Sequence, residues 1–193
     1  DKTRCSIYID GAFYCGIKLE VAVKYRLKAG MHIEKSELDA IQLETEKSQA
    51  VDKAMTHLSA SMKTQKQMRD FLEKKGYSPA VCDYVLEKLR YYNLIDDVQY
   101  CRAYINGAKG KGKRALQAEL IKRGADRRAI DNALGDFEEN CGEALLVLQK
   151  YMRGKENSRE NILKGYKYLL SKGFGYDTAK SAAQAFGECD EDY

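Results

Sequence analysis

The chain has 193 residues, 32% of which are charged, and it carries a formal net charge of +4. Its mean hydropathy of -0.58 and the lack of any window near the roughly 18 apolar residues of a membrane span exclude an integral membrane protein. The six cysteines form no CxxC pair and there are only two histidines, so we expect no metal, no other cofactor and no histidine-based catalytic centre. Because the sequence opens without an apolar leader and its cysteines are typical of reduced thiols, we expect a cytoplasmic protein.

Residues 1–47 differ in pattern from the rest of the chain. Within them, the stretch RCSIYIDGAFYCGI alternates apolar and polar residues around an Asp-Gly pair, which is a strong signal for a β-hairpin. We expect a short helix ending at Gly30 to follow, then a brief strand at 31–33 and a second helix at about 36–47. A lone hairpin is only marginally stable in water. This extension should therefore pack on its own helix, on the next module or on another chain.

A repeated pattern of helix signals follows this extension. Three glycines that each end a predicted helix, Gly76, Gly124 and Gly173, are separated by 48 and 49 residues. Each has a leucine four residues earlier and a basic residue immediately before it. A glycine just past a helix with a basic last turn is typical of a helix C-terminus. The matching leucine, basic residue and glycine indicate three copies of one helical unit.

The helix starts in this pattern carry capping residues. Each helix that follows one of the glycines begins with a predicted N-cap, and these are Ser78, Asp126 and Asp177. Thr64 and Gln67 form a possible capping box for the first glycine-terminated helix, and Asp96 is a cap for the next helix along the chain. The caps divide each copy into three helices, the first of which begins near residue 50 in the first copy.

The predicted fold class is mainly α, with three tandem three-helix repeats after a small N-terminal β-hairpin and helix extension. The predicted boundaries are 1–47 for the extension, 48–97, 98–140 and 141–188 for the repeats, and 189–193 for an acidic tail. Each repeat is short for an independent core. We therefore expect the repeats to bury faces against each other in an elongated, curved array, and we expect a monomer.

Positive charge is concentrated in the second repeat. Between residues 98 and 128 there are nine basic and two acidic residues, an excess of seven that exceeds the net +4 of the whole chain. Within this segment AKGKGKR, at 108–114, alternates lysine and glycine before a predicted helix, which suits phosphate contact through ammonium groups and backbone N–H groups. It is not a P-loop, because GxxxxGK[ST] is absent. The residues that we expect to contact an anionic partner are Lys109, Lys111, Lys113, Arg114, Lys122, Arg123, Arg127 and Arg128.

The sequence shows no pattern of catalytic residues. Nucleophile motifs such as GxSxG and the metal-binding HExxH are absent. The acidic pairs at 96–97 and 138–139 fall at predicted helix ends, where capping explains them. Repeated helices with a basic segment and no catalytic motif favour a binding or regulatory protein over an enzyme.

Several segments resemble the RecX family of bacterial regulators of RecA. The matching stretches are LEKKGYSPAVCDYVLEKL, LIDDVQYCRAYI, a Gly/Lys/Arg linker and LQAELIKRGADRRAIDNAL, and RCSIYIDGAF resembles an extension found in some members. The resemblance covers roughly 52–186 and is strongest in the first two repeats. It implies tandem three-helix units and a non-enzymatic protein that lodges along the RecA–DNA filament. It also implies lower RecA ATPase, strand exchange and coprotease activity in recombination and SOS repair, with DNA contacted directly or through RecA.

Other functions remain consistent with the same residues. One alternative is a helical repeat protein that binds DNA without RecA, which would show a steep salt dependence of DNA binding in the absence of RecA. A second is a scaffold for another acidic protein, because charge alone does not separate nucleic acid from an acidic protein surface. An enzyme would need a pocket that the sequence does not indicate.

Overall fold

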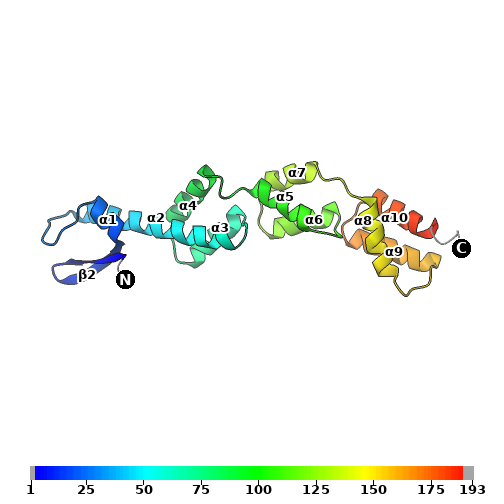
Figure 1. The fold of residues 1–193 in the computed structure, drawn as a ribbon, viewed down its shortest axis with the longest axis horizontal. Helices are drawn as coiled ribbons and strands as arrows, with labels where there is room; N and C mark the ends of the chain where they lie inside the picture. Colours follow the sequence, from blue (N-terminus) through cyan, green and yellow to red (C-terminus); the bar gives the residue numbers. More distant parts are fainter. Residues whose placement is uncertain (1–2, 189–193) are drawn as a thin grey trace. The chain divides into compact units, whose positions relative to one another are not determined.

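The structure is a computed structural model that describes residues 3–188, and Figure 1 shows the order of its elements. Between those residues it contains ten helices and two strands, so the predicted mainly α fold with an N-terminal hairpin is confirmed. The chain divides into two compact units. The first comprises the chain up to Met62 together with Met68–Ile95, and the second comprises Lys63–Gln67 and the chain from Asp96 onward. The elongated stacking of the repeats stays a prediction, and the predicted acidic tail at 189–193 lies outside the described residues.

The first unit begins with the predicted β-hairpin. Strands β1 (Arg4–Ile9) and β2 (Ala12–Lys18) pair antiparallel. The turn residues Asp10 and Gly11 have positive φ angles of 48° and 82°. A two-residue hairpin turn needs this left-handed backbone at both positions, because the twist of the turn then matches the twist of the two strands. The sequence signal of alternation around Asp-Gly therefore predicted this element correctly.

The segment after the hairpin differs from the prediction. Helix α1 (Leu19–Lys24) ends before the predicted stop at Gly30, because Arg26 already adopts a left-handed φ of 51°. Residues 31–33 form no strand, since β1 and β2 make up the two-stranded sheet by themselves within the described chain. A helix that stops at an arginine carries no glycine signal, which explains the incorrect boundary.

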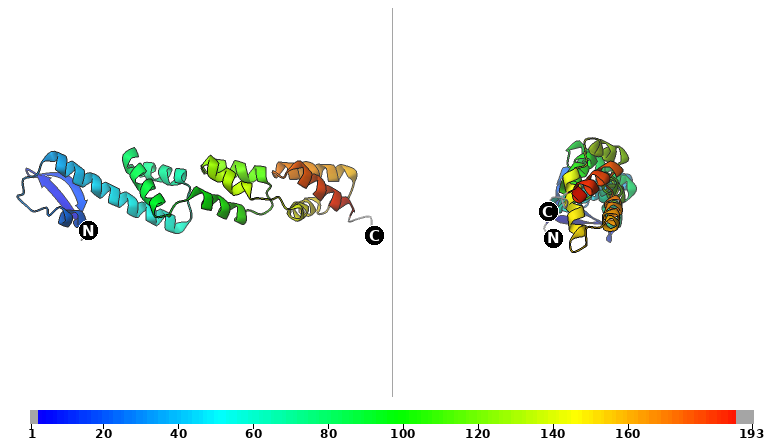
Figure 2. Two further views of the ribbon diagram at one scale, coloured as in Figure 1. Left: turned by 90° about the horizontal axis from the view of Figure 1, so that it is seen from above. Right: turned by 90° about the vertical axis from the view of Figure 1, so that its right-hand side faces the viewer.

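Helix α2 (Lys35–Ala60) has 26 residues. Figure 2 shows that it is one uninterrupted helix. The sequence predicted two helices here, at 36–47 and from about 50 to 60, and this prediction is wrong. The predicted module boundary at 47/48 falls inside the continuous helix. No glycine or proline interrupts this stretch, so nothing in the backbone ends the helix. Its first half packs on β2 and its second half on α4, so α2 belongs to both the extension and the first repeat.

Helices α3 (Gln65–Lys74) and α4 (Pro79–Tyr91) complete the first repeat. The capping box is confirmed: the Thr64 N–H donates to Gln67 Oε1 and the Gln67 N–H donates to Thr64 Oγ1, each at 3.1 Å. Ser78 caps α4 as predicted, by accepting the backbone N–H of Val81. The buried core of this repeat is formed by Ala50, Ala54, Met68, Leu72, Val81, Cys82, Val85, Leu86, Leu89 and Ile95.

The second repeat contains α5 (Asp97–Gly107), α6 (Lys113–Lys122) and α7 (Arg127–Gly135). Asp96 and Asp126 cap α5 and α7 as predicted. The core is formed by Tyr100, Cys101, Ile105, Leu116, Leu120, Ala129, Ile130, Ala133 and Leu134. Helix α6 turns its leucines into this core and leaves its basic residues outside.

The third repeat contains α8 (Cys141–Met152), α9 (Arg159–Ser171) and α10 (Tyr176–Glu188). The predicted cap at Asp177 is wrong, because α10 begins one residue before it, at Tyr176, and the Ala179 N–H donates to the Gly175 carbonyl.

The three predicted helix stops, Gly76, Gly124 and Gly173, have φ angles of 87°, 76° and 85°. No helix in the described part of the chain has the length and apolar character needed to cross a membrane.

Candidate functional site

The eight basic residues predicted to contact an anionic partner lie in the loop at 108–112, on α6, at the stop that follows α6 and at the start of α7. Seven of them are exposed and Lys111 is half-buried. By position in the chain they form two groups, one before and at the start of α6, the other at its end and at the start of α7. A ten-residue helix spans roughly 15 Å, which separates the groups along the chain.

The loop before α6 is bound to the third repeat through its backbone. The N–H of Gly112 donates to the carbonyl of Lys172 at 3.0 Å, and the N–H of Arg114 donates to the carbonyl of Gly173 at 3.2 Å. These carbonyls belong to the C-terminal end of α9, which leaves its last carbonyls without partners inside the helix. The start of α6 and the end of α9 therefore satisfy each other's backbone groups.

Two carboxylates add to this contact. Glu139 accepts the N–H of Lys113 at 2.8 Å on one oxygen and the N–H of Gly175 at 2.7 Å on the other. Glu143 accepts the N–H of Gly110. Protein acceptors therefore occupy the N–H groups of Gly110, Gly112, Lys113 and Arg114, and these four are not available to a phosphate. Phosphate contact by the side chains of the loop stays a prediction.

The glycines in this contact are required by close packing within the protein. A Cβ atom on Gly112 would lie 2.2 Å from the backbone nitrogen of Phe174, and one on Gly173 would lie 2.3 Å from that of Ala115. Both separations are far below any real Cβ contact. Gly112 in AKGKGKR therefore allows the close approach of the third repeat.

Lys111 and Arg123 converge on Tyr104 and Glu119. Lys111 Nζ lies 2.6 Å from both carboxylate oxygens of Glu119, and the Tyr104 hydroxyl donates to the same carboxylate. The guanidinium of Arg123 lies 4.5 Å from the centre of the Tyr104 ring. The hydrogen bond from Lys111 lowers the pKa of Glu119, and the same bond raises the pKa of Lys111. These two cations therefore already have partners within the second repeat.

Four of the remaining cations lie where helix stability does not explain them. Helix α6 begins with Lys113 and Arg114, helix α7 begins with Arg127 and Arg128, and neither first turn contains an acid. A helix N-terminus favours anions, so these positions disfavour positive side chains. Within the described chain none of the four forms an ion pair, although Arg114 lies over the Tyr176 ring at 5.0 Å. We define the α6–α7 basic surface as Lys109, Lys113, Arg114, Lys122, Arg127 and Arg128.

The prediction that capping explains the two acidic pairs is confirmed for three of the four residues. Asp96 caps α5, and Glu139 caps the start of α6. Asp97 is buried and accepts the N–H of Gln65 at 2.9 Å and the N–H of Asp126 at 2.8 Å. Between residues 3 and 188 no three His, Cys, Asp or Glu side chains converge into a group that could hold a metal ion.

The sequence reasoning missed the partners of the basic residues. Glu119 lies four residues before Arg123 on one helix face, a spacing that signals proximity and could have been used. Tyr104, Glu139 and Tyr176 gave no such signal, because they approach from other helices or linkers.

Three family models match the chain in the order that the repeats predict. The model of the regulatory protein RecX N-terminal domain matches residues 1–34. The model of the first RecX three-helix domain matches residues 50–89, and that of the second matches residues 96–134.

Relatives and solved structures agree with these matches. The regulatory protein RecX of Bacillus subtilis (strain 168) is 30% identical over 197 residues that cover 98% of this chain and 75% of that protein. The Bacillus licheniformis protein of the same name is 29% identical, and the match covers 95% of this chain and 73% of that protein. A crystal structure of regulatory protein RecX has a TM-score of 0.79 at 24% identity, covering 95% of this chain and 96% of that one. The crystal structure of RecX from Lactobacillus salivarius has a TM-score of 0.68 at 23% identity, and the match covers 72% of this chain and 96% of that one.

The two structural likenesses, at under 25% identity, concern the fold alone. The sequence matches also identify the family, because the Bacillus subtilis relative is matched over three quarters of its length at 30% identity. With the three family models matched in order as well, the chain belongs to the RecX family.

Proposed function

We propose that this RecX-family protein binds the RecA–DNA filament and lowers the ATPase, strand-exchange and coprotease activities of RecA. The observation that carries the proposal is the α6–α7 basic surface on a RecX fold. Four of its six exposed cations, Lys113, Arg114, Arg127 and Arg128, are placed at helix starts, where they weaken the helix, and none of the four forms an ion pair within the described chain. Charges that cost stability and remain uncompensated are expected to serve an anionic partner.

The basic surface fits a filament in two ways. Lysine and arginine side chains neutralise DNA phosphates and also steer association with an acidic protein surface. Because the glycine-rich loop is held to the third repeat, Lys113 and Arg114 extend from a fixed backbone. A fixed array of cations loses less conformational freedom on binding than a mobile loop does.

The proposal is tested by RecA ATPase on single-stranded DNA, with this protein titrated from well below the RecA concentration upward. Inhibition at a small fraction of the RecA concentration is the expected result, because a protein lodged on the filament affects many RecA subunits. An ATPase rate that does not change at any ratio would contradict the proposal.

The second candidate function is DNA binding without RecA, which the same exposed cations favour. In that case inhibition would appear only near stoichiometric amounts and added DNA would relieve it. Affinity for DNA measured without RecA would also fall steeply with salt, in proportion to the number of phosphates contacted.

A further inference from the structure

Three tyrosines lie exposed along α4 and at its end, away from the α6–α7 basic surface in the sequence. Tyr91 is 80% exposed, Tyr92 is 58% exposed and Tyr84 is 36% exposed. We propose that this surface binds single-stranded nucleic acid by stacking unpaired bases on Tyr91 and Tyr92. We define the α4 tyrosine surface as Tyr84, Lys88, Tyr91 and Tyr92 with the flanking Lys47 and Arg90.

The helix geometry places these side chains together. Tyr84, Lys88 and Tyr91 are four and three residues apart, so they form one stripe along α4. Seven residues of helix separate the two tyrosines by about 10 Å along the axis. The opposite side of α4 is buried in the core of the first repeat, so the stripe is held on a packed helix.

The end of α4 fixes the tyrosine pair. Asn93 adopts a left-handed φ of 53°, and the N–H of Leu94 donates back to the carbonyl of the buried Leu89 at 2.8 Å. The rings of Tyr91 and Tyr92 meet edge to face, with centres 5.1 Å apart and planes at 86°. In this arrangement the edge of one ring meets the face of the other, and broad flat ring surface remains toward solvent. A flat exposed ring face is what a nucleic-acid base stacks on.

Cations flank the rings. Lys47 from α2 lies 4.7 Å from the centre of the Tyr84 ring and Lys88 lies 5.9 Å from it. Arg90 is exposed between the tyrosines in the sequence. The acids on the exposed side of α4 are Glu87 and Asp83, and Asp83 is already paired with Arg69. The surface therefore keeps a positive excess next to its aromatic rings.

This combination favours single-stranded nucleic acid over a protein partner. Protein interfaces are enriched in tyrosine but depleted of lysine, whereas the α4 tyrosine surface carries two lysines against one ring. Aromatic rings interleaved with cations are the pattern of platforms that stack bases and track phosphates. Single strands are favoured over duplex because the base faces of a duplex are already stacked on each other.

The inference goes beyond the proposed function, because it places a nucleic-acid contact in the first repeat, whereas both candidate functions rest on cations of the second. Experiments without RecA therefore test it separately: its failure would leave the filament proposal standing, and the reverse also holds.

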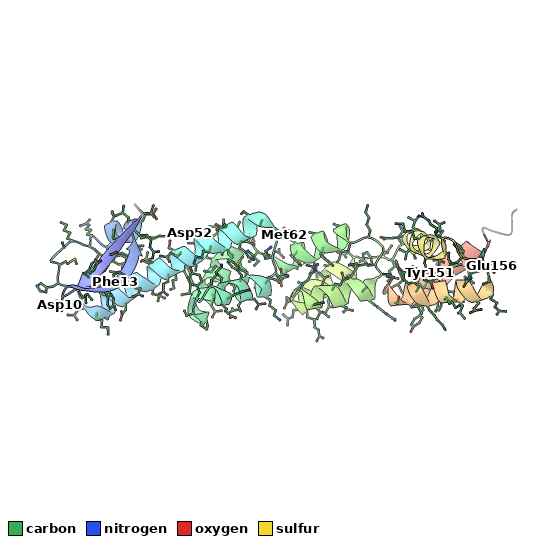
Figure 3. The ribbon with its side chains drawn as sticks, turned by 90° about the horizontal axis from the view of Figure 1, so that it is seen from below. Asp10, Phe13, Asp52, Met62, Tyr151 and Glu156 are labelled. Atoms are coloured by element: carbon green, nitrogen blue, oxygen red, sulfur yellow. The ribbon has the colours of Figure 1, made fainter. Side chains whose placement is uncertain are left out.

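The decisive experiment uses tryptophan fluorescence, since the chain has no tryptophan. The variant Tyr91→Trp carries a single reporter at the proposed stacking position, and a single-stranded oligothymidylate is titrated into the full-length protein without RecA. The matched control is Phe13→Trp, at a position 62% exposed near the hairpin turn, beside Asp10 in Figure 3. We expect quenching for Tyr91→Trp and none for Phe13→Trp. Equal emission with and without the oligonucleotide at Tyr91→Trp, or quenching by duplex only, would overturn the inference.

A second set of variants tests the ring itself. The double variant Tyr91→Ala/Tyr92→Ala should bind the oligonucleotide about fivefold or more weakly, since the loss of one stacked base corresponds to at least about that factor. Tyr91→Phe/Tyr92→Phe keeps both rings and should bind like the parent. Helical circular dichroism should be unchanged in both, because both side chains are exposed. If the alanine pair binds the oligonucleotide as the parent does but loses inhibition of RecA, the surface serves a protein and the inference is wrong.

Discussion

The carboxylate of Glu139 caps the start of α6 by accepting the backbone N–H of Lys113 at 2.8 Å. Helix α6 needs this partner, because its own N-cap residue is Gly112, which has no side chain to offer. The second oxygen of Glu139 accepts the N–H of Gly175, just before α10. One carboxylate thus caps a helix of the second repeat and holds the third repeat to it.

The variant Glu139→Ala should lower the free energy of unfolding by about 1–3 kcal/mol, because two backbone N–H groups lose a charged acceptor. Partial access to water should keep the loss toward the lower end of this range. Urea denaturation followed by circular dichroism measures it. The control is Glu138→Ala, an exposed neighbour, which should change stability by less than about 0.5 kcal/mol. Equal effects of the two variants would show that the cap contributes nothing.

The close approach at Gly112 leads to a second prediction. Its Cβ in Gly112→Ala would lie within about 2.3 Å of backbone atoms of Gly173 and Phe174, which cannot rotate away. We expect a loss of about 1–3 kcal/mol, and faster hydrogen exchange at the Gly112 and Arg114 amides as the two repeats separate. The control is Gly135→Ala, where a Cβ meets nothing within 4 Å. That change, at the end of α7, should be neutral or slightly stabilising, and a similar loss there would contradict the steric explanation.

The parts of the fold that the sequence predicted depend on neighbours within a few residues. The capping box of Thr64 and Gln67, the caps at Asp96 and Asp126 and the stop at Gly124 are each formed by residues one to four positions apart. Such signals are local, so a single sequence contains them. Among the wrong predictions, the split of α2 assumed an interruption where no helix-breaking residue exists, and the cap at Asp177 was misplaced by two positions, because Gly175 is the residue before the helix.

The candidate site was predictable in composition but not in contacts. Charge density identified the segment that holds the α6–α7 basic surface, and most of its residues are exposed. Lys111 binds Glu119, which lies eight residues further along the chain. The three- and four-residue spacings of a helix face do not predict this pair. The contact between Lys113 and Glu139 joins residues 26 positions apart. Pairings of this kind depend on how the repeats stack, which local sequence does not encode.

The buried carboxylate of Asp97 leads to a third prediction. It is 5% exposed and accepts two backbone N–H groups, from Gln65 and Asp126. In Asp97→Asn one oxygen becomes an NH₂ group, which would face one of those donors. We expect a loss of roughly 1.5–3 kcal/mol, the range for hydrogen bonds to charged groups, measured by urea denaturation. Asp131→Asn, at an exposed position on α7, is the matched control and should be near neutral. A fully stable Asp97→Asn would mean that the charge is not needed there.

The cysteine thiols should differ sharply in reactivity. Burial, followed by the nearby charge of Asp97, raises the pKa of Cys101 from its ordinary value of 9.0 to about 11. Cys141 is exposed. Alkylation with iodoacetamide at pH 8, followed by peptide mapping, should label Cys141 and leave Cys101 unlabelled until urea unfolds the protein. Labelling of both at the same rate in the folded protein would contradict the buried site.

The same shift has a consequence for stability at high pH. The folded protein keeps the Cys101 proton at pH values where the unfolded chain has lost it. The contribution of the protonated Cys101 thiol to the free energy of unfolding is therefore fully present below pH 9, and it is lost as pH rises from about 9 to 11. Replacing Cys101 by alanine should reduce this part of the slope of unfolding free energy against pH. An unchanged slope would show that the thiol titrates normally in the fold.

The α6–α7 basic surface is tested by a variant in which stability and function should move in opposite directions. In Arg127→Glu/Arg128→Glu, two acids replace two cations in the first turn of α7, where the helix dipole favours negative charge. The protein should gain about 0.3–1 kcal/mol per charge, while its inhibition of RecA ATPase should require a higher concentration. The control is Lys35→Glu, which makes the same change at the exposed first residue of α2 and should leave inhibition unchanged. Because the variant is expected to be more stable, lost inhibition could not come from misfolding. If inhibition were retained in full, the filament contact would have to involve other residues than Arg127 and Arg128.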